Sequence, residues 1–154
     1  MEETKNELVA EPMMNQIATN IFGGDQRTKS ATSLDLNDEE QADMLLNSMQ
    51  DVDFRLNEVI GQEIEVIGAY VTERESDTVN EETGEVITRK KHTLMLFDKD
   101  GKSYVTGSNA CYMSYIYIIS IKGVPTKERP IKLIPIKVDA KEKGHTYLKL
   151  KIAK

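Results

Sequence analysis

The most regular alternation of apolar and polar residues lies near the end of the chain, where residues 146–153 read TYLKLKIA. A period of two residues predicts a strand with two different faces. The apolar face, expected to point into the core, carries Leu148, Leu150 and Ile152. The opposite face, expected to be exposed, carries Tyr147, Lys149 and Lys151.

Further strands are predicted from residue 61 onward. Residues 62–75 and 85–97 are rich in β-branched and aromatic side chains, and the turn sequence NEETGE (80–85) separates them. They predict a long hairpin whose outer end is polar and charged. A second turn at residues 98–102 contains Asp-Gly, a favoured hairpin dipeptide, and leads into a short third strand that ends at Gly107. Residues 131–138 predict another strand, and Pro135 indicates an edge or a bulge.

Two segments show helical spacing. Residues 37–50 begin with Asn37 as the expected N-cap and Glu40 three positions later, followed by an apolar stripe. Residues 109–123 fit two interpretations, because their Ile and Tyr content favours a strand whereas their spacing fits a helix. Ser108 or Asn109 could cap this helix and Gly123 could end it, so we predict a helix.

The first 33 residues lack sustained periodicity, contain Gly23-Gly24 and end in a Thr/Ser-rich stretch, which predicts a flexible arm. Five apolar residues there recur at roughly helical spacing: Met13, Met14, Ile17, Ile21 and Phe22. They are either a chance cluster or an oligomerisation segment that orders on contact with a neighbouring copy or a partner. The predicted organisation is an arm (1–33), a helix with a connector (34–60) and a β domain (61–154).

The predicted order of elements in residues 61–154 is three strands, one helix and two strands. This order matches the five-stranded OB-fold barrel, which has its helix between strands 3 and 4. The expected fold class is therefore mainly β, an OB-fold barrel preceded by an N-terminal helix and a flexible arm. With a strand at residues 109–121, the same order would instead give an all-β sandwich or barrel.

Three stretches carry a resemblance to a known family: GQEIEVIGAYV from residue 61, TGSNACYMSY from residue 106 and GHTYLKLKIA from residue 144. With a basic second strand after the turn near residue 80, residues 61–153 resemble the small single-stranded DNA-binding proteins of bacteriophages and conjugative plasmids. The resemblance implies an OB-fold that coats exposed strands in replication or recombination without catalysing a reaction.

Charge is unevenly distributed. The chain has 26 acidic and 20 basic residues, for a net charge of -6. Residues 1–60 sum to -9, whereas residues 122–154 sum to +7. All six tyrosines also follow residue 61. Cations beside aromatic rings are what a single-strand groove requires, because cations neutralise phosphates and rings stack on bases. The alternative is a solvated lysine face that prevents strand edges from aggregating.

These patterns select candidate binding residues. An OB-fold binds oligonucleotides with strands 2 and 3 and with the loops between strands 1 and 2 and between strands 4 and 5. The predicted nucleic-acid-binding residues are Arg74, Arg89, Lys90 and Lys91 on the hairpin, Tyr70 and Tyr104 as groove rings, Lys141 and Lys143 in the last turn, and Tyr147, Lys149 and Lys151 on the final strand. Phe97 is expected in the core. For the hairpin cations, the competing interpretation is a charged ribbon that stays soluble.

Other functional classes have little support. No nucleophile-elbow, zinc-protease or P-loop motif is present, so we expect no enzyme activity, no cofactor and no metal. Cys111 is the only cysteine, which excludes a disulfide within one chain. The acidic N-terminus lacks the features of an export signal, and no apolar run is long enough to span a membrane. We expect a protein of the reducing cytoplasm of a bacterial host.

The sequence therefore predicts a protein that binds single-stranded DNA largely without sequence preference, with single-stranded RNA left open. Its expected partners are further copies of itself, through the arm, and replication proteins. The alternative is a non-enzymatic β-barrel adaptor that binds another protein.

Overall fold

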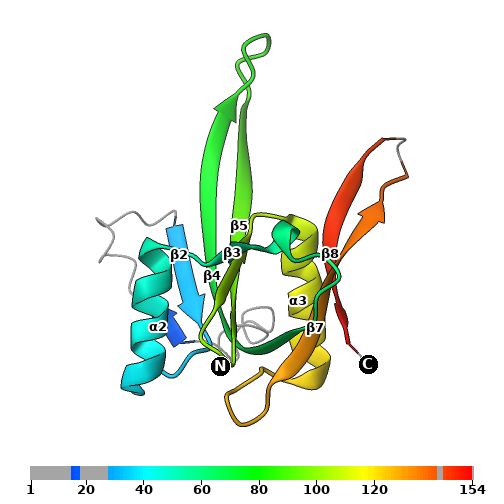
Figure 1. The fold of residues 1–154 in the computed structure, drawn as a ribbon. Coiled ribbons are helices and arrows are strands. Elements are labelled where there is room, and N and C mark those ends of the chain that lie inside the picture. The colour runs from blue at the N-terminus through cyan, green and yellow to red at the C-terminus, as the bar shows by residue number, and fades with distance from the viewer. Residues whose placement is uncertain (1–14, 18–27, 142–143, 154) are drawn as a thin grey trace.

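A computed structural model describes residues 15–17, 28–141 and 144–153, which form one eight-stranded sheet and two α-helices. The strands are β1 (Asn15–Ile17), β2 (Thr28–Thr32), β3 (Phe54–Arg55), β4 (Ile64–Val79), β5 (Val86–Asp98), β6 (Ser103–Thr106), β7 (Ile131–Asp139) and β8 (Thr146–Ile152). The helices are α2 (Glu39–Gln50), α3 (Asn109–Lys122) and the short 3-10 turn η2 (Leu56–Glu58). The protein is thus mainly β (Figure 1), and α3 follows β6 and precedes β7 along the chain.

β4 is the strand on which the sheet is organised. Along one edge it pairs with β5 over nearly its whole length. Along its other edge it pairs first with β7, over Ile64–Val66, and then with β2, over Tyr70–Arg74. A register shift between Val66 and Gly68 lies between these two partners. Because a bulge bends its strand and increases the local twist, β7–β8 and β1–β2 diverge from β4, and the sheet curls into a half-barrel.

The absence of a side chain at Gly68 is required at this bend. A Cβ at Gly68 would lie 2.5 Å from Cδ2 of Leu34, whose side chain is fully buried. Ser33 holds the same segment in place, because its N–H donates to the Ala69 carbonyl at 3.0 Å and its Oγ accepts from the Ala69 N–H at 2.9 Å. The chain before α2 therefore lies directly on the bulge.

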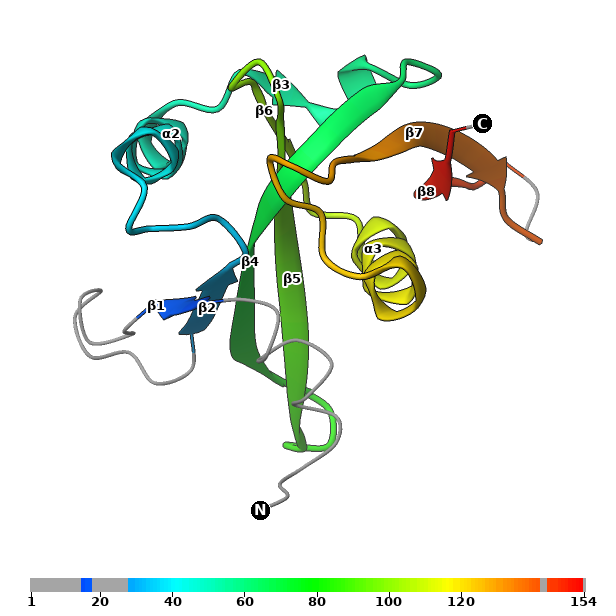
Figure 2. The same cartoon turned by 90° about the horizontal axis from the view of Figure 1, so that it is seen from below.

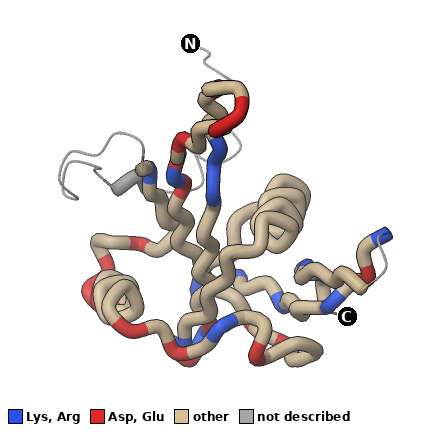
Figure 3. Tube along the Cα trace, turned by 90° about the horizontal axis from the view of Figure 1, so that it is seen from above, with Lys and Arg blue, Asp and Glu red and all other residues tan. Residues whose placement is uncertain are grey.

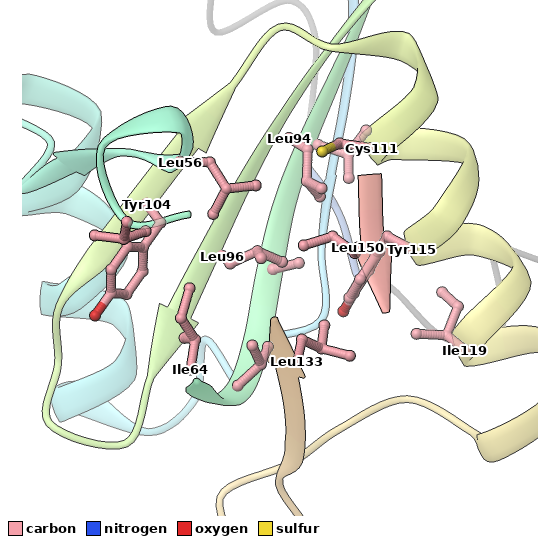
Figure 4. Packing of buried hydrophobic residues seen from close by; sticks show 14 residues of the cluster. Leu56, Ile64, Leu94, Leu96, Tyr104, Cys111, Tyr115, Ile119, Leu133 and Leu150 are labelled. Carbon is pink, nitrogen blue, oxygen red and sulfur yellow. The ribbon is translucent and has the colours of Figure 1, made fainter. Parts of the chain in front are cut away.

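The main core fills the space between the curled sheet and α3. Figure 4 shows Leu94 and Leu96 of β5 facing Cys111, Tyr115 and Ile119 of α3. The remaining buried apolar members are Leu56, Val59, Ile64, Val66, Ala69, Val71, Tyr104, Leu133 and Leu150. Every strand from β4 to β8 thus contributes to this core or packs against it, so α3 and the half-barrel form one unit.

A second core covers the opposite face of β4 and β5. Leu34 and Leu45, from the N-terminal segment and α2, pack there with a second set of buried residues, Ile67, Tyr70, Met95 and Phe97. Figure 2 shows α2 and α3 on opposite sides of the β4–β5 pair. Both faces of these strands are therefore covered near the middle of the molecule. The expected core position of Phe97 is confirmed, since its side chain is fully buried.

The ambiguous segment after β6 is a helix, as predicted, and the alternative of a strand there is wrong. Ser108 is the N-cap, and its side chain accepts from the Cys111 N–H at 3.1 Å. Gly123 ends the helix with a φ of 87°, a conformation that glycine adopts without strain. The N-cap and the terminal glycine therefore identify this segment as a helix, although its composition alone favoured a strand.

Three details of the sequence prediction need correction. The sheet of the described residues has eight strands, because β1, β2 and β3, which precede residue 61 and were not predicted, join the five strands β4–β8. β2 lies within the segment predicted to be a flexible arm, yet its Ser30 and Thr32 are buried and it pairs with β4. Asp38, not Asn37, caps α2 by accepting from the Glu40 N–H at 3.0 Å.

The predicted oligomerisation segment is described at one position only. Ile17 lies in β1, opposite Ser30 of β2. Met13, Met14, Ile21 and Phe22 lie outside the described residues. Any deletion of the arm should therefore stop before Thr28, where the paired part of β2 begins.

The edge, one of the two positions predicted for Pro135, fits the structure, because β4 pairs with β7 only as far as Leu133. The Pro135 carbonyl accepts from the Gly61 N–H at 2.8 Å, beyond the point where β7 pairs with β4. The nitrogen of a strand residue points to the same side as its carbonyl, so the N–H that proline lacks would not have donated to β8. Proline is therefore tolerated at this position without loss of a ladder bond.

Gly68→Ala is expected to lower the free energy of unfolding by about 1–3 kcal/mol, because the added methyl overpacks Leu34. Leu34→Ala alone should lower the free energy of unfolding by about 2–5 kcal/mol. The double variant should be about as stable as Leu34→Ala, because the shorter side chain at position 34 makes room for the added methyl. Urea denaturation measures all three. Gly107→Ala is the control, because no heavy atom lies within 4 Å of a Cβ there. Full additivity of the two substitutions would contradict this account.

Candidate nucleic-acid interface

The half-barrel is open between β6 and β8. In the part of the chain that the structure describes, no ladder joins these two strands, and β8 pairs only with β7. Ser108 spans the opening at one point. Its Oγ–H donates to the Leu148 carbonyl at 3.2 Å while the same oxygen caps α3. One edge of β8 is thus free along most of its length, at a place where side chains from several elements meet.

A hollow of about 470 Å³ lies at this opening. Arg55 and Lys137 contribute positive charge to it, from β3 and β7 respectively. The other described residues that line it are Val52, Asn57, Val105, Thr106, Gly107, Ser108, Thr146, Tyr147 and Leu148, and none of them is acidic. The arrangement suits an anion with polar and apolar parts.

A second hollow, of about 400 Å³, runs between α3 and β8. Lys149 and two aromatic rings, Tyr117 and Tyr147, line it together with a set of small and apolar residues: Ala110, Met113, Ser114, Ile118 and Leu150. Tyr117 is 63% exposed and Tyr147 is 40% exposed. Tyr147 lines both hollows, so its ring lies where the two meet. We call the two hollows and the outer face of β8 together the β8 surface.

The faces of β8 are as predicted. Tyr147, Lys149 and Lys151 are exposed, whereas Leu150 is buried and its neighbours Leu148 and Ile152 are half-buried. The exposed residues lie opposite three half-buried aliphatic residues of β7, namely Val138, Ile136 and Ile134. The lysine stems can therefore rest on apolar surface while their ammonium groups stay in water.

The β4–β5 hairpin carries its charges on two distinct faces. Residues paired across antiparallel strands share a face, so Glu73 and His92 lie on the α3 side with Glu75 and Lys90. Lys90 Nζ lies 3.7 Å from a Glu73 oxygen and 4.0 Å from a Glu75 oxygen. The positive charge of Lys90 is therefore balanced within the hairpin.

The same face is fixed against α3 near the hairpin base. The ring of His92 stacks on that of Tyr112, with centroids 4.0 Å apart and planes 6° from parallel. His92 Nε2 lies 3.0 Å from Glu73 Oε1, and Nδ1 lies 3.3 Å from Asn109 Oδ1. Burial, and then the Glu73 carboxylate, raises the pKa of Tyr112. These contacts give the hairpin a defined direction from the body of the protein.

On the opposite face of the hairpin, every charged residue is a cation. Arg74 pairs with Lys91, and Arg89 pairs with Ser76, so these three cations face away from α3. Among the described residues, no carboxylate oxygen lies within 4.0 Å of any of the three. Figure 3 shows the basic stretch on β5 and the basic residues of β7 and β8 as separate groups. The run Arg89-Lys90-Lys91 is thus divided, and only Arg89 and Lys91 join Arg74 on the cationic face.

Tyr70 and Tyr104 do not lie in an open groove, which corrects their predicted role as groove rings. Tyr70 is 8% exposed and its hydroxyl donates to Ser30 Oγ at 3.3 Å. Tyr104 is 9% exposed, donates to Asp98 Oδ2 at 2.7 Å and stacks on Phe54 with centroids 5.3 Å apart. Burial, and then the bond to Asp98, raises the pKa of Tyr104. Neither ring has a free face on which a base could stack.

Other candidates differ in what the structure shows. Lys141 is exposed in the turn between β7 and β8, and Lys143 lies outside the described residues. Sequence reasoning missed Arg55, Lys137 and Tyr117 as neighbours of the β8 surface. Lys137 follows the alternation of β7, which could have placed it on the face of Leu148, but nothing in the sequence indicated that Arg55 would lie near β8.

Comparisons of the chain with protein-family models, curated proteins and solved structures found no match. No described helix is both long and apolar enough to cross a membrane. Within the described ranges, no group of three or more His, Cys, Asp or Glu residues could hold a metal ion. The geometry of the β8 surface and of the hairpin is therefore the basis for a functional proposal.

Ser108→Ala is expected to lower the free energy of unfolding by about 1–2 kcal/mol, because it removes the cap of α3 together with the bond to β8. Ser108→Thr keeps the hydroxyl and should recover most of this stability. Ser120→Ala is the control, because the Ser120 hydroxyl donates to the Ile116 carbonyl at 2.6 Å, a bond within α3 that joins no other element. Thermal denaturation compares the three variants, and equal effects of Ser108→Ala and Ser120→Ala would contradict the bridging role.

Proposed function

We propose that the protein binds single-stranded DNA along the β8 surface. The observation that carries the proposal is the position of Tyr147, an exposed ring at the junction of two hollows. Cations line these hollows and none of their described lining residues is acidic, although the chain as a whole has a net charge of -6. Such local segregation of charge is the electrostatic footprint of a polyanion site.

The binding mechanism follows from the chemistry of these side chains. Tyr147 and Tyr117 offer ring faces on which bases can stack, and stacking tolerates every base. Three cations line the hollows and can neutralise phosphates there, namely Arg55, Lys137 and Lys149, and Lys151 is exposed farther along β8. Neither interaction reads base edges, so binding is largely independent of sequence. It breaks no covalent bond and requires no cofactor, so the proposed protein is not an enzyme.

The strand pairing supports the finer assignment to an OB-fold. β4 pairs with β5 and β7, β5 pairs with β6, and β7 pairs with β8, which are neighbours in that barrel order. In this scheme the β4–β5 and β7–β8 turns flank the binding groove. Both hairpins project toward the same end of the molecule in Figure 1. The opening between β6 and β8 then corresponds to the partly open side of the barrel.

The proposed biological setting follows from the family resemblance described above. The protein would coat single strands during replication or recombination of a bacteriophage or plasmid, in the cytoplasm of a bacterial host. Copies would associate through the apolar positions of the N-terminal arm, and replication proteins would be further partners. Single-stranded RNA offers the same phosphates and base faces, so parallel titrations with DNA and RNA of one sequence decide between them.

The alternative function is a protein–protein adaptor. Ile121 is 87% exposed and Tyr117 is 63% exposed on one helix, an apolar surface that another protein could cover. A single-stranded DNA column separates the two functions. The proposed protein is retained at low salt and released at high salt, whereas an adaptor with a net charge of -6 passes through.

Tyr147→Ala is expected to weaken binding to a short single strand by about 1–3 kcal/mol, because one stacked base loses its partner. Tyr147→Phe should bind nearly as well as the unchanged protein, since stacking uses the ring rather than the hydroxyl. Fluorescence anisotropy with a labelled oligonucleotide measures both. Ile121→Ala is the matched control, because it also shortens an exposed apolar side chain but lines neither hollow. Equal losses in the Ala and Phe variants would contradict stacking.

Replacing Arg55 and Lys137 together by Ala is expected to flatten the salt dependence of binding. The log–log slope should become less negative by about 1.4, since each neutralised phosphate of a single strand contributes about 0.7. Titrations at several salt concentrations measure the slope. Lys132→Ala is the control on the same strand, because Lys132 pairs with Glu63 at 3.7 Å and lies outside the hollows. An unchanged slope in the double variant would exclude both residues from the phosphate path.

A further inference from the structure

The outer half of the β4–β5 hairpin has features that the proposed single-strand site does not use. β2 pairs with β4 as far as Arg74, and beyond that point β4 and β5 continue as a two-stranded ribbon, residues 75–79 and 86–90 (Figure 1). Five residues of strand beyond β2 extend about 17 Å. The His92–Tyr112 stack fixes the base of the ribbon to α3. The ribbon is therefore a projecting arm with a defined base.

The arm has a cationic face along its length and an aliphatic tip. Arg74, Arg89 and Lys91 form its cationic face, which has no described carboxylate within ion-pair distance. At the tip, Val79 and Val86 are 57% and 59% exposed, and Ile87 is exposed beside them. Aliphatic side chains at the tip of a projecting ribbon are not covered by any described part of the chain. A partner that is anionic along its length and apolar at one point would match both features.

The cationic face lacks what a single-strand site requires. From residue 72 outward, neither strand contains Phe, Tyr or Trp, and the one imidazole, His92, lies on the other face and stacks on Tyr112, so the cationic face has no ring to stack on a base. The β8 surface has such rings, whereas the ribbon face has cations alone. Cations without rings suit a nucleic acid whose bases are already stacked inside a duplex, where the phosphates are the accessible groups.

The shape of the ribbon also fits a duplex. The major groove of B-DNA is about 12 Å wide and admits a two-stranded β-ribbon. Aliphatic side chains of DNA-binding proteins insert between base steps as wedges. Because the cationic face points away from α3 and β8, a single strand on the β8 surface would not occupy it. A duplex segment next to the bound single strand could.

We propose that the β4–β5 hairpin binds the duplex beside a single strand, so that the protein recognises a single-strand/duplex junction. Arg74, Arg89 and Lys91 contact the duplex phosphates, and the aliphatic tip rests on or wedges into the base steps near the junction. This inference rests on the proposed function, because the β8 surface holds the single-stranded side of the junction.

The test compares three probes: a single strand, a blunt duplex, and a duplex with that single strand as an overhang. The unchanged protein should bind the tailed duplex at least about tenfold more tightly than the single strand. Its log–log salt slope on the tailed duplex should be steeper by up to about 2.7, at about 0.9 for each of three duplex phosphates. Equal affinity and slope for the two probes would overturn the inference.

Variants assign the gain to the ribbon. Replacing Arg74, Arg89 and Lys91 by Ala should remove the preference for the tailed duplex and leave single-strand affinity unchanged. Lys90→Ala is the matched control, because Lys90 lies in the same run of cations but on the other face of the hairpin, where it pairs with Glu73 and Glu75. Replacing Val79, Val86 and Ile87 by Ser should keep the salt slope and abolish fraying of the terminal base pair, reported by a 2-aminopurine base. The ribbon assignment is wrong if the triple Ala variant still prefers the tailed duplex. It is also wrong if that variant loses affinity equally for the tailed duplex and the single strand.

The same experiment distinguishes this inference from the proposed function. If the unchanged protein does not bind the single strand, the proposed function fails. Binding of the blunt duplex that depends on Arg74, Arg89 and Lys91 would still support the ribbon as a duplex site. If single-strand binding depends on Tyr147 but the duplex adds nothing, the proposed function holds and the junction inference is overturned.

Discussion

The fold depends on a change of partner along one edge of β4. Over Ile64–Val66 that edge binds β7, and from Tyr70 onward it binds β2. A flat strand would direct both neighbours into one plane, but the bulge before Gly68 turns them apart. The half-barrel with α3, the second core under α2 and the projecting hairpin all follow from this bend, and the contact of Leu34 with Gly68 holds it in place.

The sequence predicted the long hairpin, the first helix and the two C-terminal strands because each has a strong local signal, and it predicted the second helix from its spacing and end residues although its composition favoured a strand. It did not predict β2, since Ser30 and Thr32 are polar yet buried. Their hydroxyls are satisfied by distant groups, as in the bond from Thr32 Oγ1 to the Ala69 carbonyl at 2.7 Å. Whether such polar residues are buried depends on which strand pairs with them. The alternation within a short polar segment does not indicate that partner. The error that extended the flexible arm to residue 33 has the same origin.

In the candidate interface, too, some residues could be predicted from local sequence and others could not. Alternation within one strand placed Tyr147 and its flanking lysines outward, because that property is local. Arg55 and Lys137 come near Tyr147 only because the barrel remains open between β6 and β8, and this is a property of the tertiary fold. Tyr70 and Tyr104 are buried because Ser30 and Asp98 supply hydroxyl partners from other elements. An aromatic residue on a strand is as suitable for a core as for a groove, and only its neighbours decide.

The free edge of β8 has a consequence for the solubility of the protein. An unpaired strand edge exposes N–H and C=O groups that can pair with the same edge of another molecule, and proteins commonly use lysines to oppose such aggregation. Lys149 and Lys151 stand on this strand, so the charges that we assign to phosphate contacts also keep copies apart. Substitutions that remove both charges would promote aggregation, and a bound polyanion that neutralises them would bring neighbouring edges within reach of each other.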